Sequence, residues 1–276
     1  MTGGPLAGKT TLVTGATRGA GLAIAQELGR AGATVIVTGR TTRATGPREG
    51  LPGNVEDAAD AVTQAGGRGI PIRCDHAKMD DVRALRDQIP APLDALVCNA
   101  WGGYEQHDTR EFVRPFWEHD FETRWRTMFE AGLRASLLAA HVLAPKIADG
   151  GLLLATVAWD EGKYLGAAYY DVAKAAIVRA TQAWAHDLRA RRIASMALAP
   201  GFMRTERVMA AHAQHPFDLS ATESPTYLGR AVVALARDPN VLARSGRVQY
   251  VGDLARELGF TDEDGRAPPR FALPES

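Results

Sequence analysis

Short apolar runs alternate with longer segments of helical spacing along most of this chain. The runs are rich in aliphatic and β-branched residues and stop at glycine or at polar residues, as buried strands do; they cover residues 9–14, 33–38, 69–74, 93–99, 151–157, 192–198 and 248–251. Apolar residues at helical spacing fill the intervals, over residues 22–31, 55–65, 80–89, 125–148, 170–191 and 224–237. Strands that alternate with helices pair in parallel through right-handed crossovers. The pattern therefore predicts an α/β protein with a Rossmann-like, doubly wound parallel sheet in a three-layer α/β/α sandwich.

Two long stretches and the end of the chain fall outside this pattern. Residues 104–122 are polar and aromatic, and residues 202–224 have no clean period. Residues 261–276 contain three prolines and are predicted to form a loose tail. We see no internal repeat and no linker, so we expect residues 1–276 to form one domain.

Charge and composition exclude several classes of partner. Acidic and basic residues balance at 32 each, so no overall charge draws the chain to nucleic acid or to an anionic membrane. The apolar runs are too short to span a bilayer, and residues 1–8 lack the pattern of a signal peptide. Cys74 and Cys98 lie in apolar runs and are predicted to be buried free thiols. We expect a soluble cytoplasmic protein without nucleic-acid or membrane partners.

No metal site is predicted. His212 and His215 are three residues apart, a spacing that can ligate a metal on a helix, but no third ligand accompanies them.

A glycine-rich turn joins the first predicted strand to the first helix. Its sequence is Thr14-Gly15-x-x-x-Gly19-x-Gly21, with Thr17 and Arg18 inside it. Small residues let backbone N–H groups approach a pyrophosphate, and the following helix adds the positive end of its dipole. The turn is therefore predicted to bind dinucleotide phosphates, although its spacing differs from Gly-x-Gly-x-x-Gly.

The end of the second strand bears on the choice of dinucleotide. An NAD-binding fold places there an acid that holds the ribose hydroxyls, whereas this chain has Arg40, with Arg43 nearby and Arg18 in the glycine turn. Guanidinium groups match phosphate with paired donors, which favours the 2′-phosphate of NADP; otherwise Arg40 and Arg43 are surface charges. Asp75, after the third strand, could accept from adenine or cap the next helix, and both remain open.

A tyrosine and a lysine lie one helical turn apart at Tyr170 and Lys174. They project from the same face of a helix. A nearby ammonium favours the phenolate and lowers the pKa of a phenol. Tyr170 is therefore a candidate general acid or base, tuned by Lys174.

These motifs together resemble the classical short-chain dehydrogenase/reductase family, from residue 9 to about residue 269. The resemblance rests on four motifs in the family's order, namely the glycine turn, Asn99-Ala100, Tyr170-x-x-x-Lys174, and Pro200-Gly201-Phe202-Met203-Arg204-Thr205. Three further stretches are similar to a branch typified by dehydrogenase/reductase family member 1: Trp101-Gly102-Gly103, Gly132-Leu133-Arg134, and residues 254–265.

The resemblance implies an NADP-dependent oxidoreductase that moves a hydride between NADPH and a carbonyl/alcohol pair. Tyr170 would exchange the proton, Lys174 would lower its pKa and hold the nicotinamide ribose, and Thr156 aligns with the hydroxyl that usually assists as serine. The family's helix asparagine, which positions a relay water, aligns with Gly132. The implied cofactor contacts are Gly15, Thr17, Arg18, Gly19, Gly21, Arg40, Asp75, Asn99, Ala100, Tyr170, Lys174, Pro200, Gly201 and Thr205.

The substrate side is less specific. Trp101, Trp159 and Phe202 follow predicted strand ends, and residues 201–225 form the expected substrate loop. Nothing in the sequence selects the substrate, the physiological direction or the stereochemistry. Reduction of an imine or enoyl bond, and a weakly catalytic NADP-binding sensor, are the alternatives. Family members are commonly dimers or tetramers, so we expect a homodimer or homotetramer.

Overall fold

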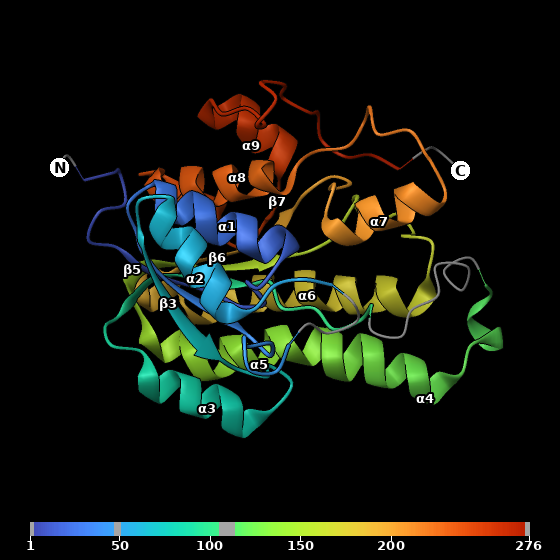
Figure 1. Cartoon of the computed structure of the whole chain (residues 1–276), viewed down its shortest axis with the longest axis horizontal. Coiled ribbons are helices and arrows are strands. Elements are labelled where there is room, and N and C mark those ends of the chain that lie inside the picture. Colours follow the sequence, from blue (N-terminus) through green and yellow to red (C-terminus); the bar gives the residue numbers. More distant parts are fainter. Residues whose placement is uncertain (1–2, 47–50, 105–113, 274–276) are drawn as a thin grey trace.

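A seven-stranded parallel sheet forms the centre of the protein (Figure 1). The computed structural model describes residues 3–46, 51–104 and 114–273. The strands are β1 (Thr10–Val13), β2 (Thr34–Gly39), β3 (Arg68–Arg73), β4 (Leu93–Cys98), β5 (Ile147–Thr156), β6 (Ala194–Ala199) and β7 (Val248–Tyr250). The strands lie side by side in the order β3-β2-β1-β4-β5-β6-β7, so successive strands are added on one side of β1 up to β3 and on its other side from β4. Every neighbouring pair is parallel. This confirms the predicted doubly wound fold.

Helices cover both faces of the sheet (Figure 1). One apolar cluster joins the sheet to α1 (Gly19–Arg30), α2 (Val55–Gln64), α8 (Pro225–Arg237) and α9 (Val251–Leu258). A second cluster joins the opposite face to α3 (Met79–Gln88), α5 (Arg134–Leu143) and α6 (Ala168–Asp187). The central strands are buried on both faces, which is why their sequences are continuous apolar runs. Cys74 and Cys98 are buried free thiols, as predicted.

The predicted helix over residues 125–148 is wrong in its details. The segment is built from α4 (Phe121–Arg124), a π-helical stretch η3 (Trp125–Leu133), α5, and a 3₁₀ turn at Ala144–Lys146. Strand β5 then begins at Ile147, earlier than predicted. Gly150 has φ of +79°, a conformation that glycine adopts without strain, so the strand continues through it.

The predicted loose tail is wrong for residues 261–273, because long-range hydrogen bonds hold this segment against the domain. The buried Asp262 carboxylate accepts from the backbone N–H of Ser224 at 2.8 Å and from its hydroxyl. The Tyr227 hydroxyl donates to the Pro268 carbonyl at 3.1 Å. Helix α9, which the sequence pattern did not predict, precedes this segment.

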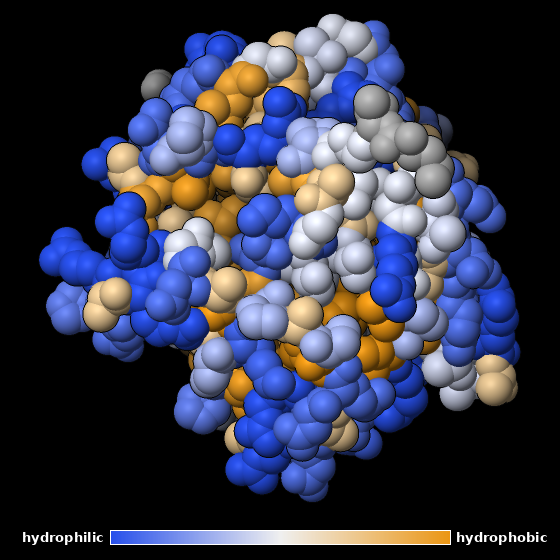
Figure 2. All heavy atoms as spheres, turned by 90° about the vertical axis from the view of Figure 1, so that its left-hand side faces the viewer, coloured by the Kyte–Doolittle hydropathy of each residue, from blue (hydrophilic) through white to orange (hydrophobic). Residues whose placement is uncertain are grey.

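The surface at the amino ends of the strands is mostly hydrophilic, with apolar side chains exposed in the hollows (Figure 2). None of the helices in the described part of the chain is long and apolar enough to cross a membrane.

Candidate active site

The predicted site residues follow the carboxyl ends of five different strands. Gly15 follows β1, Arg40 follows β2, Asn99 follows β4, Thr156 ends β5, and Pro200 follows β6. Parallel strands bring these ends to one edge of the sheet, where ligands bind in folds of this kind.

The glycine turn is held from behind by the strand that neighbours it. The Thr14 hydroxyl accepts from the backbone N–H groups of Asn99 at 2.8 Å and Ala100 at 2.9 Å. The Asn99 side-chain amide donates to the carbonyls of Thr14 at 3.1 Å and Gly15 at 3.2 Å. Gly15 has φ of +65°, and a Cβ there would lie 2.7 Å from the Ala100 Cα. Asn99 and Ala100 therefore set the shape of the turn.

One contact shows that the turn can bind an anion. The Gly19 backbone N–H donates to the Glu206 carboxylate, from the first turn of α7 (Glu206–Gln214), at 3.2 Å. An amide at the start of α1 thus already faces an anionic oxygen, as it would face a cofactor phosphate. The turn fits a dinucleotide diphosphate, which would displace this carboxylate.

The basic residues near the end of β2 separate into two groups. Arg43 forms ion pairs with Asp57, at 2.7 Å, and with Asp60, so it is committed to α2. Arg40 lies close enough to His76 to help lower the pKa of that ring, although burial is the larger cause of its fall to about 4. Arg18 occupies the residue before α1. Arg43 is thus engaged with α2, and the cofactor contacts of Arg18 and Arg40 stay predictions.

Thr17 and Asp75, two further predicted cofactor contacts, lie near the ends of β2 and β3. The Thr17 side chain packs on Gly39, where a Cβ would lie 2.5 Å from its Cγ2. Asp75 accepts from the backbone N–H of Ala77 at 3.1 Å, in the turn before α3. Asp75 therefore does not cap α3, whose N-cap residue is Lys78 and has no side-chain cap bond, and the contact with adenine stays a prediction. His76, whose Nε2 lies 2.7 Å from the Thr38 hydroxyl, was not singled out from the sequence.

Tyr170 and Lys174 are both buried near the start of α6. Burial raises the pKa of Tyr170 well above its ordinary value and lowers the pKa of Lys174 to about 7. The expected lowering of the Tyr170 pKa by Lys174 is therefore not found, because burial raises this pKa most and the neighbouring Tyr104 raises it further. A raised pKa keeps Tyr170 protonated at neutral pH, which is the form that can give a proton.

Trp101 covers Lys174. The Lys174 Nζ lies 3.4 Å from the centroid of the indole ring, a cation–π contact that favours the ammonium and so opposes the effect of burial. The ring also meets Tyr170 edge-on, with centroids 5.7 Å apart. The Trp101 Nε1 is buried and has no hydrogen-bond partner among the described residues. Of the three predicted substrate residues, Trp101 is thus brought to the Tyr170–Lys174 pair.

The position of Trp101 explains two glycines. A Cβ on Gly132, in the π-helical stretch, would lie 2.8 Å from the indole Cζ3, and a Cβ on Gly103 would lie 2.6 Å from its Cε2. The indole therefore fills the space that any side chain at residue 132 would need. The glycine found where an asparagine was expected is the partner of the tryptophan at residue 101.

Thr156 points elsewhere than predicted. Its hydroxyl donates to the Asn99 side-chain oxygen at 3.2 Å. Ala158, two residues further on, packs with the Tyr170 cluster instead. Thr156 therefore supports Asn99 and the glycine turn.

Trp159 and Phe202 are not brought to Tyr170 in the described structure. Trp159 packs on the core beneath α5 and α6. Phe202 is 45% exposed and packs on Phe217, with ring centroids 5.6 Å apart. Tyr104 does reach the pair, since its hydroxyl lies 3.0 Å from that of Tyr170. The sequence offered no signal for it, because residues 104–122 have no period.

The loop after β6 is fastened to a buried carboxylate that sequence reasoning also missed. Glu223 accepts a hydrogen bond from the backbone N–H of Gly201 and lies beside Arg204. Its Oε1 has no hydrogen-bond partner among the described residues. The Thr205 hydroxyl accepts from Val208 and caps α7. Burial is the main cause that raises the pKa of Glu223, to about 7.

Glu223→Gln is expected to stabilise the protein at pH 8 by up to about 3 kcal/mol and to have little effect at pH 4. A carboxyl whose folded pKa is raised contributes most when protonated, and this stability is lost as the pH rises from about 4.5 to about 7. The amide keeps the acceptor for Gly201 and removes the charge. Urea unfolding at the two pH values measures the difference, with the exposed Glu206→Gln as control. Equal effects at both pH values would contradict this assignment.

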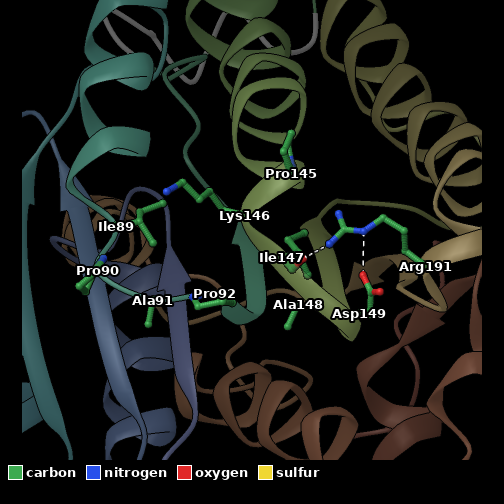
Figure 3. A pocket seen from close by; sticks show the side chains of 10 residues that line it. All are labelled: Ile89, Pro90, Ala91, Pro92, Pro145, Lys146, Ile147, Ala148, Asp149 and Arg191. Carbon is green, nitrogen blue, oxygen red and sulfur yellow. Dashed lines mark hydrogen bonds and ion pairs between the residues drawn. The ribbon is translucent and has the colours of Figure 1, made fainter.

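The hollow drawn in Figure 3 lies at the opposite end of the sheet. It is lined by residues near the amino ends of β4 and β5. Arg191 reaches across it to Asp149 at 2.8 Å and to the Ile147 carbonyl. Arg191, the arginine that lines this hollow, is thus already paired, and the lining contains none of the predicted site residues. Among the described residues, no group of three His, Cys, Asp or Glu side chains could hold a metal.

Comparison with known proteins decides the family. The family model for short chain dehydrogenases matches residues 9–216. The chain belongs to the short-chain dehydrogenase/reductase family. It is 35% identical to mouse dehydrogenase/reductase SDR family member 1, over 95% of this chain and 85% of the relative. This supports the predicted resemblance to that branch.

Solved short-chain dehydrogenases share the fold. One from Mycobacterium thermoresistibile superposes with a TM-score of 0.80 at 24% identity, over 98% of this chain and 95% of the other. One from Burkholderia cenocepacia J2315, in complex with NADP, superposes with a TM-score of 0.69 at 25% identity, over 88% and 96%. Short-chain dehydrogenases/reductases are oxidoreductases that use NAD or NADP, act on small molecules and commonly form oligomers. This chain differs from the residue motifs of the family at Trp101, at Gly132, where an asparagine is common, and at Thr156, where a serine is usual.

Proposed function

We propose that this protein is an NADP-dependent oxidoreductase that reduces a carbonyl group, or oxidises the corresponding alcohol. The observation that carries the proposal is the buried Tyr170 side chain, whose ring centroid lies 5.3 Å from the Lys174 Nζ, on the helix that follows β5 in the same parallel sheet as the glycine turn. A proton donor and a dinucleotide site side by side are what reduction of a carbonyl requires.

The chain's own residues would hold the cofactor along the sheet edge. The turn from Gly15 to Gly21 would bind the diphosphate, with Asn99 and Ala100 holding the turn in shape. Asp75 would lie on the adenosine side, and the loop of Pro200, Gly201 and Thr205 on the nicotinamide side. Bound NADPH would supply the hydride.

Tyr170 would act as the general acid. Its raised pKa keeps the proton on the phenol until a carbonyl oxygen gains negative charge. Lys174 would stabilise the resulting phenolate as an ammonium, and the ring face of Trp101 favours that charged form.

NADP is proposed over NAD on the basis of charge. Arg40 directly follows β2, where an NAD-binding fold has an acid, and Arg18 directly precedes α1, and both guanidinium groups would bind a 2′-phosphate. The Burkholderia cenocepacia relative, solved with NADP, is consistent with this choice.

We further propose a cytoplasmic homodimer or homotetramer. Phe116, Trp117, Phe121 and Trp125 expose between 45% and 71% of their surface around α4. Large exposed aromatic groups of this kind favour burial against a second copy. A monomer in sedimentation equilibrium would contradict the proposed assembly.

Turnover with a panel of aromatic ketones, quinones and diketones tests the function. We expect at least one carbonyl to be reduced with NADPH, and kcat/KM with NADH to be lower by about tenfold or more, since an NADP site loses its phosphate contacts with NADH. Absorbance of the reduced nicotinamide at matched concentrations measures both. NADPH binding without turnover of any carbonyl would point to the sensor instead, and equal use of NADH would refute the role of Arg18 and Arg40.

A further inference from the structure

The end of β5 brings no hydroxyl to Tyr170 among the described residues. Thr156 donates to Asn99, and Val157 is a buried apolar residue. Ala158, which packs with the Tyr170 cluster, ends in a methyl group. The second donor that would assist at a carbonyl oxygen must therefore come from another element.

Tyr104 supplies a hydroxyl at the right place. It lies beyond the Trp101-Gly102-Gly103 segment after β4, and its hydroxyl donates to the Tyr170 oxygen at 3.0 Å. The two rings stack with centroids 6.0 Å apart and an interplanar angle of 29°. Trp101 packs on both tyrosines, with its ring centroid 6.2 Å from that of Tyr104. The pair is therefore held by three aromatic rings.

We propose that Tyr104 is a catalytic residue whose hydroxyl, together with that of Tyr170, binds the carbonyl oxygen of the substrate in place of the serine of other family members. This inference rests on the proposed function and deepens it. Two hydroxyls 3.0 Å apart can both donate to one oxygen that lies within hydrogen-bond distance of each of them. Tyr104 comes from the segment after β4, whereas the serine of other family members aligns with the end of the neighbouring strand β5.

The proton and electron balance of the step leaves Tyr104 unchanged. Bound NADPH would supply the hydride and the two electrons from its C4–H bond. The carbonyl π bond would break, a C–H bond would form with that hydride, and an O–H bond would form with the proton released when the Tyr170 O–H bond breaks. Tyr104 keeps its proton, stabilises the negative charge that grows on the oxygen, and afterwards donates to the Tyr170 phenolate.

The same pairing shapes the titration of the site. Once one tyrosine of the pair loses a proton, the other donates to the new phenolate, so the first proton leaves more readily than from a single buried tyrosine. The second proton is then held more tightly, since two phenolates would lie side by side. Burial raises the pKa of Tyr104 as well as that of Tyr170, and the hydrogen bond between them opposes this rise for Tyr104 and adds to it for Tyr170.

Tyr104→Phe tests the proposal by turnover of a carbonyl that the wild type reduces. We expect kcat to fall about 10²-fold, as for loss of one oxyanion donor, and NADPH affinity to stay within about twofold. Tyr164→Phe, which alters a tyrosine that is 60% exposed, is the matched control and should keep wild-type rates. Adding Ala158→Ser to Tyr104→Phe should recover about tenfold of the lost rate, since the serine restores a hydroxyl beside Tyr170. Such rescue distinguishes a donor from a packing residue.

Ultraviolet titration of tyrosinate gives a readout without turnover. The first phenolate of the pair, which has the other tyrosine as its hydrogen-bond donor, should appear about one pH unit higher in Tyr104→Phe and in Tyr170→Phe than in the wild type. If the wild type is active and Tyr104→Phe is equally active, or if the titration is unchanged, the role of Tyr104 is overturned while the proposed function stands. A wild type that reduces no carbonyl would remove the proposed function and this role with it. A Thr156→Val variant that loses the rate while Tyr104→Phe keeps it would return the role to β5.

Discussion

Replacing Tyr170 by Phe is expected to lower kcat for carbonyl reduction by about 10³-fold, within the range that positioned acid–base groups contribute, while NADPH affinity stays within about twofold. The hydroxyl is the proposed proton donor, and burial raises its pKa well above the ordinary value of a phenol. Removing one oxygen leaves the ring to pack on Trp101 and Ala173. The chemistry should therefore be lost without loss of the fold.

Steady-state kinetics and NADPH fluorescence titration measure the two quantities separately. Tyr164→Phe again serves as the control for loss of an exposed phenol. A Tyr170→Phe enzyme with wild-type kcat would show that another group gives the proton. Equal losses in NADPH affinity and kcat would show that Tyr170 acts on cofactor binding instead.

Gly132→Asn, which restores the family's asparagine, is expected to harm this protein. A Cβ at residue 132 would lie 2.8 Å from Cζ3 and 2.9 Å from Cη2 of Trp101, so the indole must leave Lys174. We expect the free energy of unfolding to fall by about 1–3 kcal/mol, as in other overpacked sites. We expect kcat to fall by about tenfold or more, because moving a group that holds the catalytic geometry by about 1 Å can cost 10²-fold.

A double-mutant cycle with Trp101→Gly tests whether the two positions act together. The double variant Trp101→Gly/Gly132→Asn has space for the asparagine, so its unfolding free energy should be higher than the sum of the single effects predicts, by about 1 kcal/mol or more. Urea unfolding of the four proteins gives the coupling. Additive effects would show that Trp101 is not what requires glycine at residue 132.

The sequence predicted the sheet and the edge at which the site forms, because both depend on local patterns. Buried strands are apolar runs, and residues at their carboxyl ends meet wherever the strands are parallel. Asn99 could be placed in this way, and Tyr170 and Lys174 could be paired from their spacing of one helical turn. Arg43 could not be separated from Arg40, because its ion pairs with Asp57 and Asp60 depend on where α2 packs.

The parts that were missed depend on contacts between segments far apart in the chain. Tyr104 meets Tyr170 across 66 residues, and Asp262 meets Ser224 across 38. No periodicity marks such partners in advance. Thr156 was assigned by its alignment with the family's serine, but its hydroxyl donates to Asn99. The Trp101–Gly132 match likewise appears only when η3 packs beside the segment after β4.

Transfer of label from NADPH tests most simply whether the protein moves a hydride from the cofactor to a carbonyl carbon. Wild-type protein is supplied with NADPH that carries deuterium at the transferring C4 position of the nicotinamide, together with the best carbonyl of the panel, and the product alcohol is analysed by mass spectrometry. We expect one deuterium on the former carbonyl carbon, and we expect the labelled alcohol to form about 10³-fold more slowly with Tyr170→Phe. Alcohol without deuterium, or NADPH left unoxidised with every carbonyl, would contradict this expectation.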